Sequence, residues 1–121
     1  MSQVNLIKQK LADLERERAA LGRLVSNRAD GWQKAYAEER RKVALQVGAL
    51  ADMAKELARL EPNAQREAFA QAAMNYAKAV TSHQSRWPAI LVNSRQEEFT
   101  ASVRQLDDSL NRVKALLGSL K

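Results

Sequence analysis

Cysteine is absent from this 121-residue chain, which excludes disulfides, thiolate metal sites, thiol nucleophiles and iron–sulfur clusters. Histidine occurs once, as His83, so the chain has neither a two-histidine metal motif nor the paired Glu-x-x-His motifs of di-iron bundles. The four glycines lie far apart and form no phosphate-binding loop. We therefore expect no cofactor, no metal site and no enzymatic activity.

Proline and glycine are scarce, at 2 and 4 residues, while 45% of the residues are hydrophobic and 28% are charged. This composition is typical of a folded, helix-rich protein of one domain. No run approaches the ~18 apolar residues of a membrane span, and residues 1–5 do not resemble the start of a signal peptide. We expect a cytoplasmic domain, in a bacterium or similar, that makes no membrane contact.

The spacing of apolar residues predicts four helices, over residues 3–27, 31–60, 63–86 and 94–119. In each range apolar residues recur at alternating spacings of three and four, which places them in one row along a helix; we call this row the seam. The predicted seams comprise Val4, Ile7, Leu11, Leu14, Leu21 and Val25; Tyr36, Val43, Val47, Leu50, Ala54 and Leu57, widened by Met53 and Leu60; Phe69, Ala73, Tyr76, Val80 and His83; and Phe99, Val103, Leu106, Leu110, Val113, Leu117 and Leu120.

The signals at the helix ends fit this division. Pro62 stops the second helix, and Asn63 is a capping residue for the third. Asp30 with Gln33, and Ser94 with Glu97, have the spacing of capping boxes. Helices of matched length with short connections pack antiparallel. We therefore predict an all-α fold, an antiparallel bundle of about four helices with coiled-coil-like heptad seams.

Arg18 and His83 are polar residues at positions of the predicted seams. Arg18 interrupts the first seam, where a charge in a closed core costs stability, so it extends its charged end to solvent, pairs with an acid or lies where a partner meets the helix. His83 extends the third seam and is expected to be a partly buried, hydrogen-bonded histidine.

The only consecutive basic run is Arg40-Arg41-Lys42, with Trp32 and Tyr36 close by on the same helix. A basic and aromatic surface of this kind can bind phosphates and stack bases. Two glutamates directly precede the run, however, and the net charge of +6 is spread as an excess of one or two basic residues in each quarter of the chain. An ordinary solvated helix face is the favoured interpretation, ahead of a protein partner and of nucleic acid.

An unbroken apolar run, Trp87-Pro88-Ala89-Ile90-Leu91-Val92, marks the junction of the third and fourth helices. Two interpretations stay open. The run either closes the end of this chain's own bundle, with Pro88 in the first turn of an early fourth helix, or forms a patch that docks another chain. Trp87 is the best single candidate for a docking residue, because buried tryptophans often dominate binding energy.

These observations favour a non-enzymatic protein–protein interaction module, such as an adaptor, an assembly or secretion chaperone or an accessory subunit. The alternative is a basic nucleic-acid-binding accessory protein. The expected partner is another protein, and a homodimer is also expected, because one small bundle does not cover four seams and the apolar run. The candidate partner-binding residues are Trp87, Ile90, Leu91, Arg18, Trp32, Tyr36, Arg40, Arg41 and Lys42.

Overall fold

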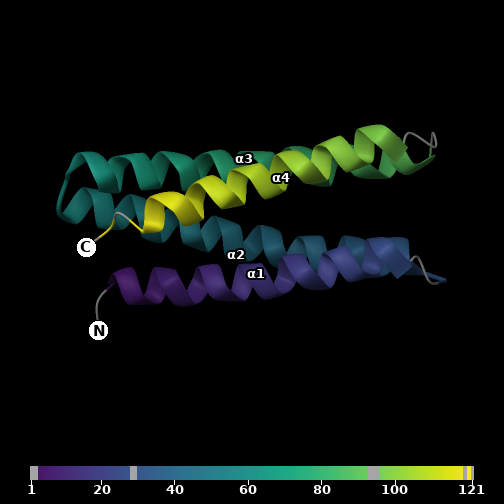
Figure 1. Ribbon diagram of the computed structural model, residues 1–121, viewed down its shortest axis with the longest axis horizontal. Coiled ribbons are helices and arrows are strands. Elements are labelled where there is room, and N and C mark those ends of the chain that lie inside the picture. The colour runs from purple at the N-terminus through teal and green to yellow at the C-terminus, as the bar shows by residue number, and fades with distance from the viewer. Residues whose placement is uncertain (1–2, 28–29, 93–95, 119, 121) are drawn as a thin grey trace.

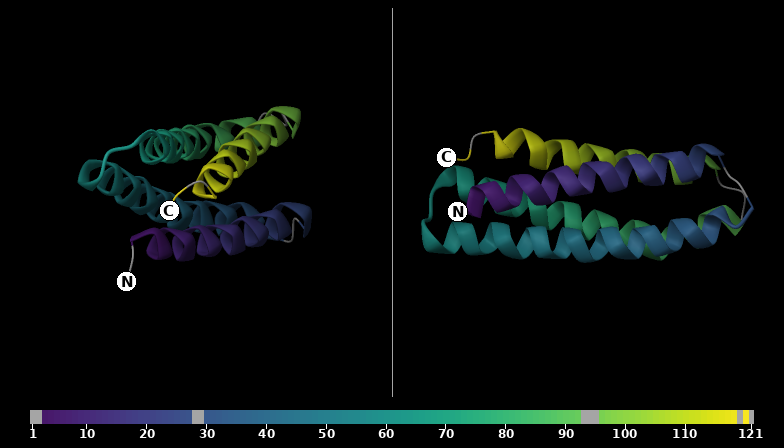
Figure 2. Two further views of the ribbon diagram at one scale, coloured as in Figure 1. Left: turned by 60° about the vertical axis from the view of Figure 1, so that its left-hand side comes forward. Right: turned by 90° about the horizontal axis from the view of Figure 1, so that it is seen from below.

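Four α-helices form an antiparallel bundle in the computed structural model, which describes residues 3–27, 30–92, 96–118 and 120. The side chains of residues 3, 87–92 and 96 lie outside the described part. The helices are α1 (Gln3–Asn27), α2 (Trp32–Leu60), α3 (Ala64–Val92) and α4 (Gln96–Leu117). Both termini lie at one end of the bundle, beside the turn between α2 and α3 (Figure 1 and the right-hand view of Figure 2). The predicted all-α antiparallel bundle is confirmed. None of the described helices combines the length and the apolar character needed to cross a membrane.

The start of α2 depends on a glycine in the left-handed backbone region. Gly31 has a φ of 79° and caps α2 without a side-chain hydrogen bond. A side chain with a Cβ atom is strained at this φ, so glycine suits the position. The capping box predicted from Asp30 and Gln33 is therefore wrong, because the backbone of Gly31 makes the entry to the helix. The box predicted at Ser94 lies outside the described residues.

The start of α3 follows the prediction. The side-chain oxygen of Asn63 accepts a hydrogen bond of 2.8 Å from the backbone N–H of Arg66, which satisfies one of the donors that a helix start leaves open. The end of α3 differs from the prediction: the helix was expected to stop near residue 86 and continues to Val92. Pro88 has no backbone N–H, so the helix lacks one hydrogen bond there. Only a single turn follows Pro88, so the destabilisation is confined to the end of α3.

Most of the apolar residues predicted for the seams are buried in the core. In α4, Phe99, Leu106, Leu110 and Val113 are buried, and in α2 every predicted seam residue from Tyr36 to Leu57 is buried. Leu60 is a correction, because its side chain is 56% exposed and does not widen the seam of α2. The alanine-rich face of α3 also contributes to the core, since Ala70, Ala72 and Ala73 are buried and their small size permits close approach of helices.

The bundle divides into two halves along its length. We call residues 4–17, 44–60, 64–75 and 108–117 the terminal half, because they lie toward the two termini, and residues 18–27, 32–43, 76–92 and 97–107 the cavity half (Figure 1). Close packing joins each helix to the next along the chain, from α1 through α4. The first turns of α4 lie beside α3 and away from α1 (Figure 1). In the cavity half, an opening lies between α1 and α4 and is lined by residues of α1, α2 and α4.

Candidate binding site

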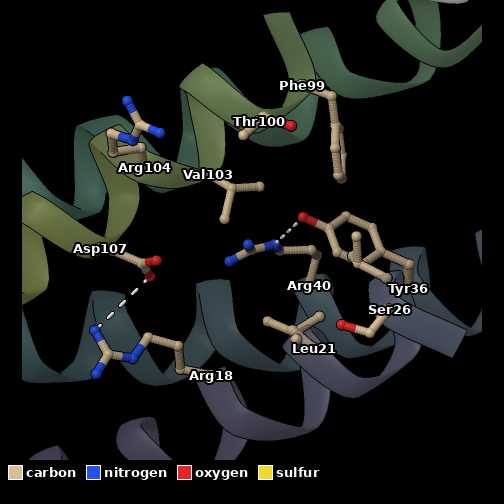
Figure 3. A pocket seen from close by; sticks show the side chains of 12 residues that line it. Arg18, Leu21, Ser26, Tyr36, Arg40, Phe99, Thr100, Val103, Arg104 and Asp107 are labelled. Atoms are coloured by element: carbon tan, nitrogen blue, oxygen red, sulfur yellow. Dashed lines mark hydrogen bonds and ion pairs between the residues drawn. The ribbon is translucent and has the colours of Figure 1, made fainter. Parts of the chain in front are cut away.

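A cavity of about 360 Å³ occupies this opening, between α1, α2 and α4 (Figure 3). Its lining combines an apolar part with several charged and hydroxyl-bearing side chains. The lining residues are Arg18, Leu21, Gly22, Val25, Ser26, Tyr36, Arg40, Phe99, Thr100, Val103, Arg104 and Asp107. Three of the charged side chains are arginines and one is an aspartate, so the cavity carries a net positive charge.

Arg40 is the buried charge of this cavity, with only 5% of its surface exposed. Its Nε donates a hydrogen bond of 2.9 Å to the Tyr36 hydroxyl, and its guanidinium carbon lies 5.1 Å from the centre of the Tyr36 ring. The guanidinium reaches from α2 into the space between Leu21 and Val103 (Figure 3). Within the described residues no carboxylate forms an ion pair with Arg40. A buried charge without a counter-charge is costly, so this arrangement requires a reason.

A chain of hydrogen bonds holds Arg40 from behind. The Tyr36 hydroxyl lies 2.6 Å from Nε2 of His83, and Nδ1 of His83 lies 2.6 Å from the Ser102 hydroxyl oxygen. The chain thus runs from α2 through α3 to α4, and His83 is only 1% exposed. Each member fixes the orientation of the next, so the position of the guanidinium is set by three helices.

The protonation state of His83 sets which groups donate and which accept along these hydrogen bonds. Burial, with the positive charges of Arg40 and Arg86, lowers the pKa of His83 to about 3, so the ring is neutral at pH 7. The Tyr36 oxygen accepts from Arg40 and the hydroxyl still has its own proton to donate, so we assign that proton to the hydrogen bond with Nε2 as the acceptor. The ring proton is therefore on Nδ1 and is donated to Ser102. Burial also raises the pKa of Tyr36, so this hydroxyl keeps its proton.

Aromatic rings pack around Tyr36 and fix it further. Its ring centre lies 6.2 Å from that of Trp32, 5.9 Å from that of His83 and 5.6 Å from that of Phe99, with the first two pairs in edge-to-face geometry. Edge-to-face and tilted aromatic pairs at these distances are favourable. The cluster makes the floor of the cavity rigid.

Arg18 of α1 lies at the edge of the cavity away from Tyr36 (Figure 3). It pairs with Glu15 at 2.8 Å and with Asp107 of α4 at 3.7 Å, and its side chain is 34% exposed. Lys114 of α4 reaches Glu15 at 3.0 Å. Of the three alternatives for Arg18, the structure shows the pairing with an acid. Asp107, the cavity's carboxylate, is thus already bound by Arg18 rather than by Arg40.

The structure does not place the predicted basic and aromatic residues on one surface. Trp32, Tyr36 and Arg40 are buried, whereas Arg41 and Lys42 are exposed and Lys42 lies 3.9 Å from Glu39. Arg18, Tyr36 and Arg40 line the same cavity. Trp32, Arg41 and Lys42 do not line it. The side chains of Trp87, Ile90 and Leu91 lie outside the described residues, so whether the apolar run closes this bundle or docks another chain stays open. The placement of Pro88 in the first turn of an early fourth helix is wrong, because α3 continues to Val92.

The sequence contains a signal for the burial of Arg40. Position 40 lies four residues after Tyr36 and three before Val43, so it completes the alternating repeat of the α2 seam. The basic run of residues 40–42 obscures this register. The α4 residues of the site, Ser102 and Asp107, carry no such signal, because nothing in a single sequence shows which turn of α4 meets α2.

The carboxylate and the histidine of this site are engaged in interactions within the chain. The described lining of the cavity includes one carboxylate, that of Asp107, which Arg18 already binds, and His83 lies behind Tyr36 with both ring nitrogens in use. The sequence matches no protein-family model and no curated protein, and the solved structures give no match.

Proposed function

We propose that this chain is a non-enzymatic protein–protein interaction module, of the adaptor, chaperone or accessory-subunit kind, that docks an acidic segment of a partner protein between α1 and α4. The observation that carries the proposal is Arg40, a buried guanidinium that faces an open cavity and forms no ion pair with a described carboxylate. Burying a charge in this way destabilises the isolated chain. An acidic partner group supplies the missing counter-charge.

The composition of the cavity supports a segment with both an acidic and an apolar part. Leu21, Val25 and Phe99 supply apolar surface beside the charged groups. Interfaces of this type gain energy from an apolar group in a pocket and specificity from charge complementarity. The lining comes from α1, α2 and α4, so a segment docked in the cavity would contact three helices (Figure 3).

The nucleic-acid alternative rests on net charge and on the basic run. Since Arg40 is buried and Lys42 has a glutamate beside it, the run presents a weaker basic surface than its sequence suggests. Binding through such a surface would be strongly salt-dependent. A cytoplasmic location, a bacterial origin and a homodimer remain predictions.

Site-specific photo-crosslinking in the source cells tests the proposed docking site. A photoreactive phenylalanine analogue replaces Thr100, an exposed residue at the cavity, and in a matched control replaces Thr81, an exposed threonine of α3 outside the cavity lining. We expect a partner that crosslinks from position 100 and not from position 81, at a peptide that contains aspartate or glutamate. That peptide, made synthetically, should then bind the purified chain.

Three results overturn the proposal. Crosslinking that is equal from the two positions shows no preference for the cavity. A crosslink from position 100 to a second copy of the chain alone assigns this opening to self-association. A crosslinked peptide that lacks acidic residues, or that does not bind on its own, contradicts the proposal that an acidic partner group pairs with Arg40.

A further inference from the structure

We infer that the cavity is a carboxylate-binding pocket in which the two terminal nitrogens of Arg40 bind a carboxylate attached to an apolar group. This inference rests on the proposed function and names the group of the docked segment that enters the cavity. It depends on the geometry of Arg40, on the way that geometry is fixed, and on the charges that surround it.

The hydrogen bonding of Arg40 leaves one edge of the guanidinium available. Its Nε donor is used by Tyr36, and the Tyr36 ring lies against the group. Among the described residues the two terminal nitrogens have no acceptor. These nitrogens carry four N–H donors in a planar fork, which matches the two oxygens of a carboxylate. A single carboxylate thus satisfies both nitrogens at once.

The hydrogen-bonded chain behind Arg40 prepares this geometry before a ligand arrives. Tyr36 is fixed by His83, and His83 is fixed by Ser102, at 2.6 Å in both contacts. A long side chain that is already held loses less conformational entropy on binding. The cavity is therefore preorganised to bind an anion at the two terminal nitrogens of Arg40.

The apolar residues beside Arg40 favour a carboxylate on an apolar stem over a small inorganic anion. Asp107 lines the same cavity and carries a negative charge, part of which Arg18 neutralises. A phosphate group carries about −1.5 to −2 at pH 7 and has no apolar part to contact this lining. Leu21, Val25, Phe99 and Val103 then favour an apolar group next to the carboxylate. The ligand is a carboxylate with an apolar stem.

Such a group has two sources in a protein partner: the carboxylate at the end of a chain, or the side chain of aspartate or glutamate beside an apolar residue. Small probes separate them. N-acetylleucine mimics an apolar residue at a chain end, and the α-amide of N-acetylglutamate mimics an internal acidic side chain. N-acetylleucinamide is the uncharged match to the first probe, and inorganic phosphate is the multiply charged control.

Titration of the full chain with each probe, followed by NMR at the side-chain N–H of Arg40 and at the backbone, tests the inference. We expect one of the two acids to bind with a dissociation constant on the order of 1 mM, which is ordinary for a ligand of this size. The neutral amide and phosphate should bind at least ~10-fold more weakly. The better acid identifies the source of the carboxylate.

Three variants assign the binding to Arg40. Arg40→Met should weaken the better acid at least ~10-fold, while Arg41→Met, on the exposed neighbouring residue, should leave it unchanged. Asp107→Asn removes the competing carboxylate and should tighten binding several-fold, on the order of what one nearby charge contributes. This last variant keeps the test decisive if Arg40→Met fails to fold.

Equal binding of acid and amide, an equal effect of Arg41→Met, or weaker binding after Asp107→Asn overturns the inference. Its failure is distinct from that of the proposed function. If an acidic segment crosslinks at position 100 but neither acid binds, the proposed docking site is supported and the proposed role of Arg40 is wrong. If an acid binds but no partner crosslinks, the carboxylate-binding pocket is supported and the proposed protein partner is not.

Discussion

The terminal half and the cavity half are built from the same four helices with the same seam spacing, yet their buried side chains differ in kind. The terminal half buries Ile7, Leu50, Phe69 and Leu110, together with alanines. The cavity half buries Arg40 and His83, the two polar or charged residues of the described core. Among the described residues, one half thus buries apolar side chains, while the other also buries a series of hydrogen-bonded polar side chains beside the cavity of α1, α2 and α4. The difference suggests that the terminal half supplies stability and the cavity half binding.

The largest effect should follow from emptying the core of the terminal half. Phe69 is fully buried, so Phe69→Ala leaves a cavity and should lower the free energy of unfolding by about 3–5 kcal/mol. Urea unfolding followed by circular dichroism measures this loss. Leu60→Ala, at an exposed position of the same half, is the control and should change the free energy by less than ~0.5 kcal/mol. Similar losses in the two variants would show that the terminal half is not a closed core.

A change of pH should act on the cavity half alone. The pKa of His83 is about 3 in the folded chain and about 6.5 when unfolded, so below pH 6.5 the unfolded state binds a proton that the folded state does not. Stability contributed by the neutral ring is present above pH 6.5 and is lost as the pH falls toward 3. Between pH 7 and pH 5 we expect a loss of about 2 kcal/mol, measured by urea unfolding at each pH.

His83 is the chain's only histidine, which makes this test clean. His83→Gln should remove the slope between pH 7 and pH 5, whatever its effect at pH 7. In the wild type, the ¹⁵N shifts of the ring should show the proton on Nδ1, as the bonds to Tyr36 and Ser102 require. A flat stability profile, or a proton on Nε2, would contradict the direction assigned to the hydrogen-bonded chain.

Removing one hydroxyl should have a smaller effect. Tyr36→Phe keeps the aromatic packing but leaves Arg40 Nε and His83 Nε2 without their shared partner, so the free energy of unfolding should fall by about 1.5 kcal/mol. Tyr76→Phe is the matched control. Tyr76 is also buried, with a pKa raised to about 12 by burial, and the described residues give its hydroxyl no hydrogen bond. Its loss should be neutral, and an equal loss in both variants would remove the special role of Tyr36.

The fold was largely predictable from the sequence, for a reason that the terminal half shows best. Its seams, such as Leu50, Ala54 and Leu57, repeat without interruption, and apolar periodicity reports directly on burial. The start of α3 at Asn63 followed from its chemistry. The entry to α2 did not, because the conformation of Gly31 depends on where the preceding residues go and not on a capping side chain.

The candidate site was predictable only in part. Arg18 and Tyr36 were identified, but as parts of different features, and Arg40 was assigned to a surface. An arginine on a seam has two outcomes, exposure through its long side chain or burial against a partner, and spacing does not decide between them. The deciding contact comes from His83, 47 residues beyond Tyr36 in the chain. Contacts at that distance are fixed by helix packing, which a single sequence does not display.

The smallest effect should come from the residue that matters most for binding. Arg40→Met removes a buried charge and its hydrogen bond to Tyr36, and these changes act in opposite directions on stability. We expect the free energy of unfolding, measured in urea, to stay within about 1 kcal/mol of the wild type. Arg41→Met, at the exposed neighbouring position, gives the baseline for loss of a surface charge.

The size of this effect separates a binding charge from a structural one. Breaking a buried ion pair costs about 3–5 kcal/mol, because it leaves the partner charge unpaired. A loss of that size in Arg40→Met would mean that Arg40 is paired within the folded chain and is not available to a ligand. A small loss, together with the loss of carboxylate binding, would mean that the chain retains a charge that its own fold does not need. That combination is expected of a residue whose counter-charge belongs to the partner.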